Sequence, residues 1–220
     1  MPSTQDTAVD DAERVDERFR SWAADEDEVR HRRRHAERLT GQHIVAVRYY
    51  DIDYRREEFA PDASGPRTVD DETEWANPTW RYPGFDAVDF AVELETAAGE
   101  VYTLTWDLPG HWESLGIHNA PAIGEVVSTE ASVAIWNVGD RTKTWAPMTR
   151  TPLTGIDLHY HPWPAPVGGF WCSRITLHTA TTTLHIVLGD AGRDGLTSSA
   201  DNLAILHPTT PIPNWPTALS

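Results

Sequence analysis

The sequence predicts a mainly β fold of the α+β class, in which an N-terminal helix precedes two similar antiparallel β units related by internal duplication. Ten tryptophans, 16 prolines and 14 glycines among 220 residues indicate many turns and an aromatic core, which favours β structure over a helical bundle. Two stretches that each open with Leu-Thr-Gly, at 39–54 and 153–163, are followed by similar hairpin patterns at 84–107 and 168–190. We therefore expect residues 39–107 and 153–207 to share one chain path, with Gly41 and Gly155 in equivalent places.

The chain divides into four segments: a helical segment rich in acids and arginines at 1–38, a first β repeat at 39–138, a second at 139–207 and a Pro-rich tail at 208–220. The helix is expected to start at Asp10 or Asp11 and to end at Gly41. Its apolar seam consists of Val15, Phe19, Trp22, Val29 and Ala36. The basic run at 30–38 is explained by favourable i,i+4 pairs with Glu26 and Glu28, which indicates a solvated helix face rather than a nucleic-acid contact.

A long connection at 55–83 has no counterpart in the second repeat. Loops of more than about 12 to 15 residues inside a domain are usually functional or disordered. The acidic part at 57–74 is typical of disorder, whereas the aromatic end at 75–82 is typical of packing.

Charge and composition limit the classes of partner. The formal net charge is −16, and residues 1–100 hold 25 of the 34 acids but 13 of the 18 basic residues. This balance disfavours nucleic acid and anionic membranes as partners and leaves a basic protein possible, although solubility alone explains it too. The sequence has no apolar run of about 20 residues and no signal-peptide pattern at its start, so we expect a cytoplasmic protein. The single cysteine, Cys172, excludes an internal disulfide and is expected to be buried and inert.

Several histidines raise the question of a metal. His159 and His161 lie two residues apart on a predicted strand, a spacing that lets two imidazoles face one ion. Residues 162–169 contain no carboxylate to complete such a site. We therefore predict no bound transition metal and no cofactor, and we expect the two histidines to lie at the surface or at the rim of the sheet. His178 and His185 are expected to form a cross-strand pair in the next hairpin.

The candidate binding residues belong to two aromatic segments of the first repeat. Large rings with a few polar groups are what a ligand cleft or an interface requires. We expect these segments to meet at one end of the first β unit; the alternative is that the tryptophans only fill the open end of the sheet. The candidates are Trp75, Trp80, Tyr82, His111, Trp112 and Glu113.

No motif for nucleophilic catalysis or phosphate binding is present in the sequence, although His111, Glu113 and His118 could serve as acid and base. Asp51 and Asp53 are two carboxylates at strand spacing, which a turn at the end of a strand explains without a metal. We therefore favour a protein without catalytic activity.

The order of these features resembles the uncharacterised duplicated β-domain proteins of high-GC bacteria over residues 39–207. The resemblance implies a fold and no activity. The residues that carry it are Leu39, Gly41, Trp106, Asp107, Trp136, Leu153, Gly155, Trp163 and the segment 199–206.

Two functions remain open from the sequence. The first is an acidic protein-interaction protein, in the style of the immunity proteins that neutralise bacterial toxins, because charge complementarity speeds association with a basic partner. The second is a small-molecule binding domain or minor enzyme with an aromatic and His-lined pocket between the repeats.

Overall fold

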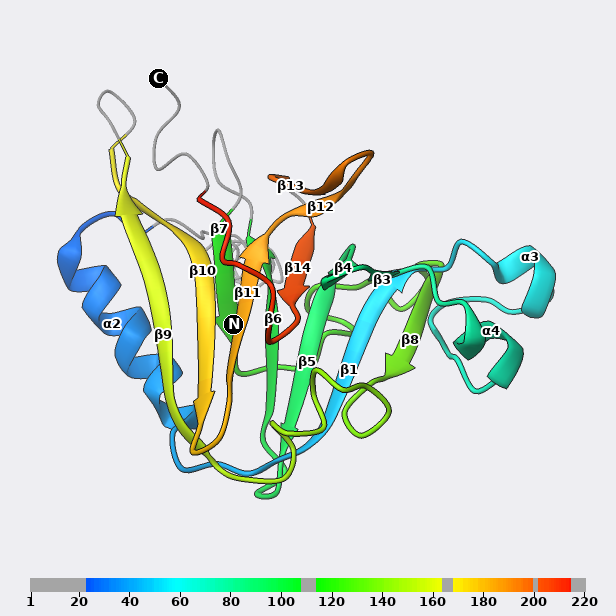
Figure 1. Cartoon of the computed structure of the whole chain (residues 1–220), viewed down its shortest axis with the longest axis horizontal. Coiled ribbons are helices and arrows are strands. Elements are labelled where there is room, and N and C mark those ends of the chain that lie inside the picture. The colour runs from blue at the N-terminus through cyan, green and yellow to red at the C-terminus, as the bar shows by residue number, and fades with distance from the viewer. Residues whose placement is uncertain (1–22, 108–113, 164–167, 200–201, 215–220) are drawn as a thin grey trace, which may run out of the picture.

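The protein is mainly β, as predicted. A computed structural model describes residues 23–107, 114–163, 168–199 and 202–214, which form two six-stranded sheets and a two-stranded hairpin (Figure 1). The first sheet has the order β2 (Arg67–Thr68), β8 (Val133–Asn137), β1 (Ile44–Ile52), β5 (Ala91–Thr96), β6 (Val101–Asp107) and β7 (Ser114–His118). The second has the order β3 (Arg81–Tyr82), β4 (Phe85–Val88), β14 (Leu203–Leu206), β11 (Thr183–Leu188), β10 (Phe170–Thr179) and β9 (Leu153–Pro162). The hairpin consists of β12 (Asp190–Gly192) and β13 (Gly195–Thr197).

One hydrophobic core joins the two sheets. Leu104 and Leu115 from the first sheet belong to the same buried cluster as Ile175 and Ile186 from the second. Successive side chains of a strand point to opposite faces, so this alternation places the apolar residues of β9, β10 and β11 inside and their histidines outside. The second sheet therefore presents a polar outer face along β9 and β10, whereas its outer face at β4 and β14 carries a smaller apolar cluster on which Ala191 and Leu196 pack.

The duplication itself is not confirmed. Strands β1, β5, β6 and β7 and strands β9, β10, β11 and β14 follow the same antiparallel order, but such a meander is common to unrelated β proteins. The two glycines are not equivalent: Gly41 has a φ of +84° in the turn before β1, whereas Gly155 lies within β9 opposite His178. The Leu-Thr-Gly segments instead lie side by side, since Gly41 N–H donates to Leu153 O at 2.7 Å.

The two sheets do not separate the chain at residue 139. Strands β3 and β4 come from the first half of the sequence, yet they extend the second sheet because β4 pairs with β14. Val88 lies opposite Leu203, and Phe85 lies opposite Leu206. The second sheet is thus completed only by segments that are far apart in the sequence.

The first described helix is shorter than predicted. Helix α2 (Glu26–Ala36) begins after Asp25, whose side chain caps it by accepting from Glu28 N–H at 2.9 Å. Ala23 forms a bridge with Phe170, so one continuous helix from Asp10 or Asp11 is wrong; residues 1–22 lie outside the described part. The predicted apolar face is confirmed where it can be followed, because Val29 and Ala36 are buried. No helix in the described ranges is long and apolar enough to cross a membrane.

The acidic connection at 57–74 is folded rather than disordered. It forms helix α3 (Arg56–Phe59), strand β2 and helix α4 (Glu72–Ala76), which lie at the end of the molecule opposite α2 (Figure 1). The Arg67 side chain binds Asp53 at 2.7 Å and Glu74 at 2.6 Å, and both carboxylates are buried. A buried ion network supplies the order that the composition did not predict.

Candidate functional site

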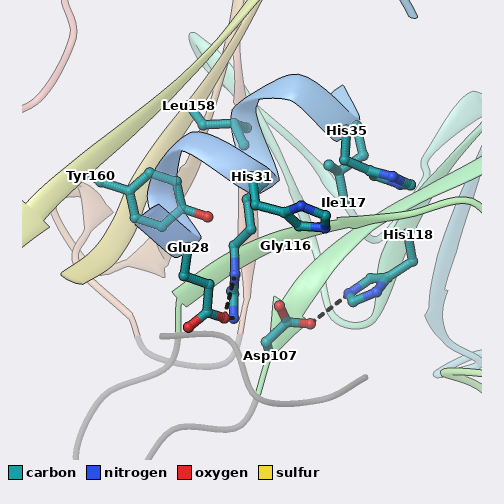
Figure 2. A pocket seen from close by; sticks show the side chains of 10 residues that line it. Glu28, His31, His35, Asp107, Gly116, Ile117, His118, Leu158 and Tyr160 are labelled. Carbon is teal, nitrogen blue, oxygen red and sulfur yellow. Dashed lines mark hydrogen bonds and ion pairs between the residues drawn. The ribbon is translucent and has the colours of Figure 1, made fainter. Parts of the chain in front are cut away.

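A cavity of about 230 Å³ lies between α2, the paired strands β6 and β7, and the edge strand β9 (Figure 2). Ionisable and hydrogen-bonding side chains from all three elements point into it. Its lining residues are Glu28, His31, Arg32, His35, Asp107, Gly116, Ile117, His118, Leu158 and Tyr160. We call this cavity the helix–sheet pocket.

Helix α2 supplies one polar stripe of the helix–sheet pocket. Glu28, His31, Arg32 and His35 recur at intervals of three and four residues, which places them on one face of a helix. The helix is fixed on the edge of the second sheet by Arg33, whose Nη2 donates to Leu158 O at 3.1 Å. This contact uses a backbone carbonyl of an edge strand, so it both anchors α2 and covers the edge.

The floor of the pocket carries an imidazole bonded to a buried carboxylate. His118 Nε2 lies 2.7 Å from Asp107 Oδ1, and the Asp107 side chain is 2% exposed. The two residues reach each other across Gly116, where an added Cβ would lie 2.0 Å from Asp107 Oδ2. Glycine at this position is therefore what makes room for the His118–Asp107 dyad.

The opposite wall combines a cation, a carboxylate and a phenol. Arg32 Nε donates to Glu28 Oε1 at 3.1 Å, and its guanidinium also interacts with the Tyr160 hydroxyl. Burial would raise the pKa of Glu28, but hydrogen bonds from Ala24 N–H and Arg32 together hold it below its ordinary value. Burial raises the pKa of Tyr160, so this phenol keeps its proton at neutral pH. The wall thus offers both donors and acceptors.

Burial also lowers the pKa of His35, and the positive charge of Arg38 adds to the effect. His35 is therefore a neutral imidazole near pH 7, able to accept a proton or a hydrogen bond. With His31 and His118 it gives the pocket three imidazoles from two elements.

The predicted aromatic site is divided by the structure. Trp75 and Trp80 are 6% and 1% exposed and pack edge-to-face with Trp136 at centroid distances of 5.1 and 5.7 Å, so both are core residues. Tyr82 is 36% exposed and stacks on Phe85. His111, Trp112 and Glu113 lie outside the described residues, and the predicted meeting of the two segments stays a prediction.

Tyr82 belongs instead to an acidic surface with a second exposed tyrosine. Tyr54 is 61% exposed, and burial together with the charges of Asp51, Asp89 and Asp190 raises the pKa of both phenols. The same three carboxylates act on both rings. We call Tyr54, Tyr82, Asp89 and Asp190 the acidic tyrosine patch; Asp51 is only 2% exposed and is not part of it.

Of the paired histidines of β9, His159 contacts a guanidinium. Arg174 Nη2 lies 3.0 Å from His159 Nδ1, and His159 Nε2 lies 2.9 Å from Thr176 Oγ1. His161 packs against Trp171. No cluster of three or more histidine, cysteine or acidic side chains suited to a metal occurs among the described residues.

Two smaller expectations can also be compared with the structure. The direct pairing of His178 with His185 is wrong: His178 lies opposite Thr183 and His185 lies opposite Thr176, so the imidazoles are diagonal neighbours. Cys172 is fully buried, as predicted, and burial raises the pKa of its thiol to about 12, which leaves it an unreactive thiol.

Sequence reasoning named His118 but not its partners. The polar stripe of α2 was interpreted only as a set of stabilising charge pairs, although its spacing also marks one helix face. Nothing in the sequence pattern marks Asp107 or Tyr160 as a neighbour of α2, since their proximity depends on how the helix packs on β9.

No family model matches the chain, and no curated protein and no solved structure is significantly similar to it.

Proposed function

We propose that this chain is a small-molecule binding protein and that the helix–sheet pocket holds its ligand. The single observation that carries the proposal is the His118–Asp107 dyad, a bonded pair with a buried carboxylate on the floor of a cavity lined by ionisable groups. An ion pair on an open surface would need neither a cavity around it nor a glycine to make room for it. One of the two functions left open by the sequence is a small-molecule binding domain or minor enzyme with an aromatic and His-lined pocket between the repeats, and the histidines of the helix–sheet pocket support the binding part of it.

The dimensions and chemistry of the pocket limit the ligand. A volume of about 230 Å³ is below the roughly 300–1,000 Å³ typical of drug-sized ligands, so the ligand is a small metabolite. Arg32 is already neutralised by Glu28, and neutral His35 and the Tyr160 phenol add uncharged partners. These groups favour a polyhydroxylated or zwitterionic molecule over a simple anion.

The dyad also determines what the pocket could do to a ligand. A carboxylate bonded to one imidazole nitrogen fixes the tautomer and the orientation of the ring, as in catalytic dyads. His118 is therefore held in a fixed position to hydrogen-bond a hydroxyl or ammonium group of a ligand. Catalysis would need a further reacting group from the ligand itself, so binding is the function proposed.

Gly116→Ala and His118→Gln are expected to abolish ligand-induced stabilisation. The alanine Cβ displaces Asp107 from His118, and the glutamine removes the imidazole. Melting temperature is measured with a panel of small sugars, polyols, amino acids and hydroxy acids at millimolar concentration. A ligand at 100 times its Kd stabilises the wild type by about 2.7 kcal/mol, which is several degrees for a chain of this size.

The matched control is His178→Gln. His178 forms a second His–Asp pair, with Asp157 at 2.8 Å, but this pair is exposed on the outer face of the second sheet. It should leave ligand stabilisation unchanged. Equal loss in His178→Gln and His118→Gln, or a panel in which no compound stabilises the wild type, would contradict the proposal.

A second candidate function is that of an acidic cytoplasmic protein that binds a basic protein partner, in the manner of an immunity protein. The acidic tyrosine patch favours it, because exposed tyrosines surrounded by carboxylates provide both hot-spot rings and complementary charge. Ile52 lies at the end of β1, two residues before Tyr54 in the sequence. Its side chain is 38% exposed and adds apolar surface.

The double variant Tyr54→Ala/Tyr82→Ala is expected to weaken this association at least tenfold, which is about 1.4 kcal/mol. The partner is captured with the tagged chain from its own host, purified, and titrated by calorimetry at 50 and 300 mM salt. Val45→Ser, which removes an exposed apolar side chain elsewhere, is the control and should bind like the wild type. A captured protein that is not basic, or that binds both variants equally, would exclude this patch as the interface.

A further inference from the structure

The outer face of the second sheet carries a cluster of histidines around one arginine in a strongly acidic protein. Residues that lie opposite each other on neighbouring strands share one face, and the register aligns His159 with Arg174 and Thr176 with His185. His161 follows His159 on the same side of β9. The chain as a whole has 34 acids against 18 lysines and arginines, so an arginine surrounded by histidines rather than carboxylates is unusual in this protein.

Arg174 is the unusual member of this cluster. Its guanidinium is half-buried, and its side-chain contacts are to the nitrogens of His159, at 3.0 and 3.4 Å. Within the described ranges it makes no ion pair with a carboxylate, and its Nε is buried without a hydrogen-bond partner. A half-buried guanidinium is normally balanced by an anion, because an uncompensated charge away from water is costly.

The cluster lines a groove closed by the C-terminal segment. A cavity of about 120 Å³ is bounded by His159, His161, Trp171, Ser173, Arg174 and Val187 from the sheet and by Ile212, Pro213 and Asn214 from the segment that follows β14. The guanidinium of Arg174, which has no carboxylate partner in the described ranges, therefore borders a space of a size suited to a small ion.

We propose that this groove, between the outer face of β9–β10 and residues 212–214, binds a small oxyanion of the phosphate type through the guanidinium of Arg174. His159 and His161 supply the neighbouring ring nitrogens, and Ser173 a hydroxyl. Arginine suits such an ion because its planar fork donates two parallel hydrogen bonds. Asp157, a carboxylate on the same face, bonds to His178 at 2.8 Å and forms no ion pair with Arg174 among the described residues.

The charge state of the histidines predicts a pH dependence. Burial first, and the charge of Arg174 second, lower the pKa of His161 and His185 and bring that of His159 to about 4. The charged and titratable groups on this face are Asp157, His159 and His161 on β9, Arg174 and His178 on β10 and His185 on β11; residues 212–214 carry none. A bound anion favours the protonated imidazoles, so affinity should rise as the pH falls.

Sulfate is the first probe, because its charge does not change between pH 5 and 8. Calorimetric titration at constant ionic strength should give saturable one-site binding to the wild type, several-fold tighter at pH 5.5 than at pH 7.5. Arg174→Gln should weaken it at least tenfold, whereas Arg30→Gln, an exposed arginine of α2, should bind like the wild type. Binding that is not saturable, or that is equal in both variants, would overturn the proposal.

Two further measurements cover the case in which Arg174→Gln does not fold and identify the kind of anion that binds. If Arg174→Gln does not fold, ¹H–¹⁵N spectra of the wild-type histidines replace it, and sulfate must shift the ring nitrogens of His159 more than those of His118. Inorganic phosphate and methyl phosphate are then compared. Equal affinity indicates that the groove takes the phosphoryl group of a larger molecule, and preference for inorganic phosphate indicates the free ion.

Discussion

Arg67→Ala is expected to lower the free energy of unfolding by about 3–5 kcal/mol, because it leaves buried charge without compensation. The guanidinium binds Asp53 through Nε and Nη2 and Glu74 through Nη1 and Nη2, at distances of 2.6 to 3.0 Å. Both carboxylate side chains are 1% exposed. With alanine in place, Arg56 at 3.0 Å from Asp53 is the remaining ion-pair partner of the two carboxylates in the described part of the chain. Urea unfolding followed by tryptophan fluorescence measures the change.

Two further variants test whether stability depends on the paired hydrogen bonds of the Arg67 guanidinium or whether the loss of any arginine has the same effect. Arg67→Lys keeps the charge but loses the paired hydrogen bonds, so an intermediate loss is expected. Arg30→Ala removes an exposed arginine whose partners Glu26 and Asp27 are also exposed, and should change stability by no more than about 0.5 kcal/mol. A loss for Arg67→Ala as small as that for Arg30→Ala would refute the role of the network.

The stability of the wild type is expected to fall as the pH rises from about 4 to 8, because of Asp51. Burial and a hydrogen bond with Asp89 raise the pKa of Asp51 to about 8 from its ordinary value near 3.8. Between these values the folded chain holds a proton that the unfolded chain releases, so unfolding becomes easier as pH rises. One group of this kind contributes a slope of at most about 1.4 kcal/mol per pH unit.

Asp51→Asn should remove this slope and make the chain more stable than the wild type at pH 8.5. Asparagine resembles a protonated aspartate: its oxygen can accept from the Asp89 backbone N–H in the place of Oδ1, and its NH₂ can donate to the Thr79 hydroxyl oxygen or to the Asp89 carboxylate. Asp157→Asn, at an exposed carboxylate, is the control and should keep the wild-type profile. Unfolding free energies at half-unit pH intervals decide the matter; a wild type that becomes more stable from pH 5 to 8 would contradict the expectation.

Local patterns predicted the elements that depend on local chemistry. The hairpin around Ala98 and Gly99 forms as expected, with Gly99 at a φ of +81°, and the charge pairs of Arg30 and Arg32 form on α2. The folded connection at 57–74 was missed because its order comes from Arg67 reaching Asp53, a residue of the preceding segment. Composition gives the number of charged residues, but it does not predict which of them form ion pairs in the folded chain.

The same distinction explains the candidate site. Tryptophans were expected at a functional surface, yet Trp75 and Trp80 fill the core, since large rings contribute most when they are buried. The helix–sheet pocket joins Glu28, Asp107 and Tyr160, which come from a helix and two different sheets. No periodicity in one segment encodes their proximity, because it is created by the contact of α2 with β9.

The place of β14 in the second sheet has a consequence for biosynthesis. This strand lies between β4 and β11, and it is translated after every other strand of both sheets. A nascent chain that has not reached residue 203 therefore exposes two open strand edges, and contacts between distant segments form slowly. Folding should finish only when this strand leaves the ribosome, and until then the chain is open to aggregation or to a chaperone.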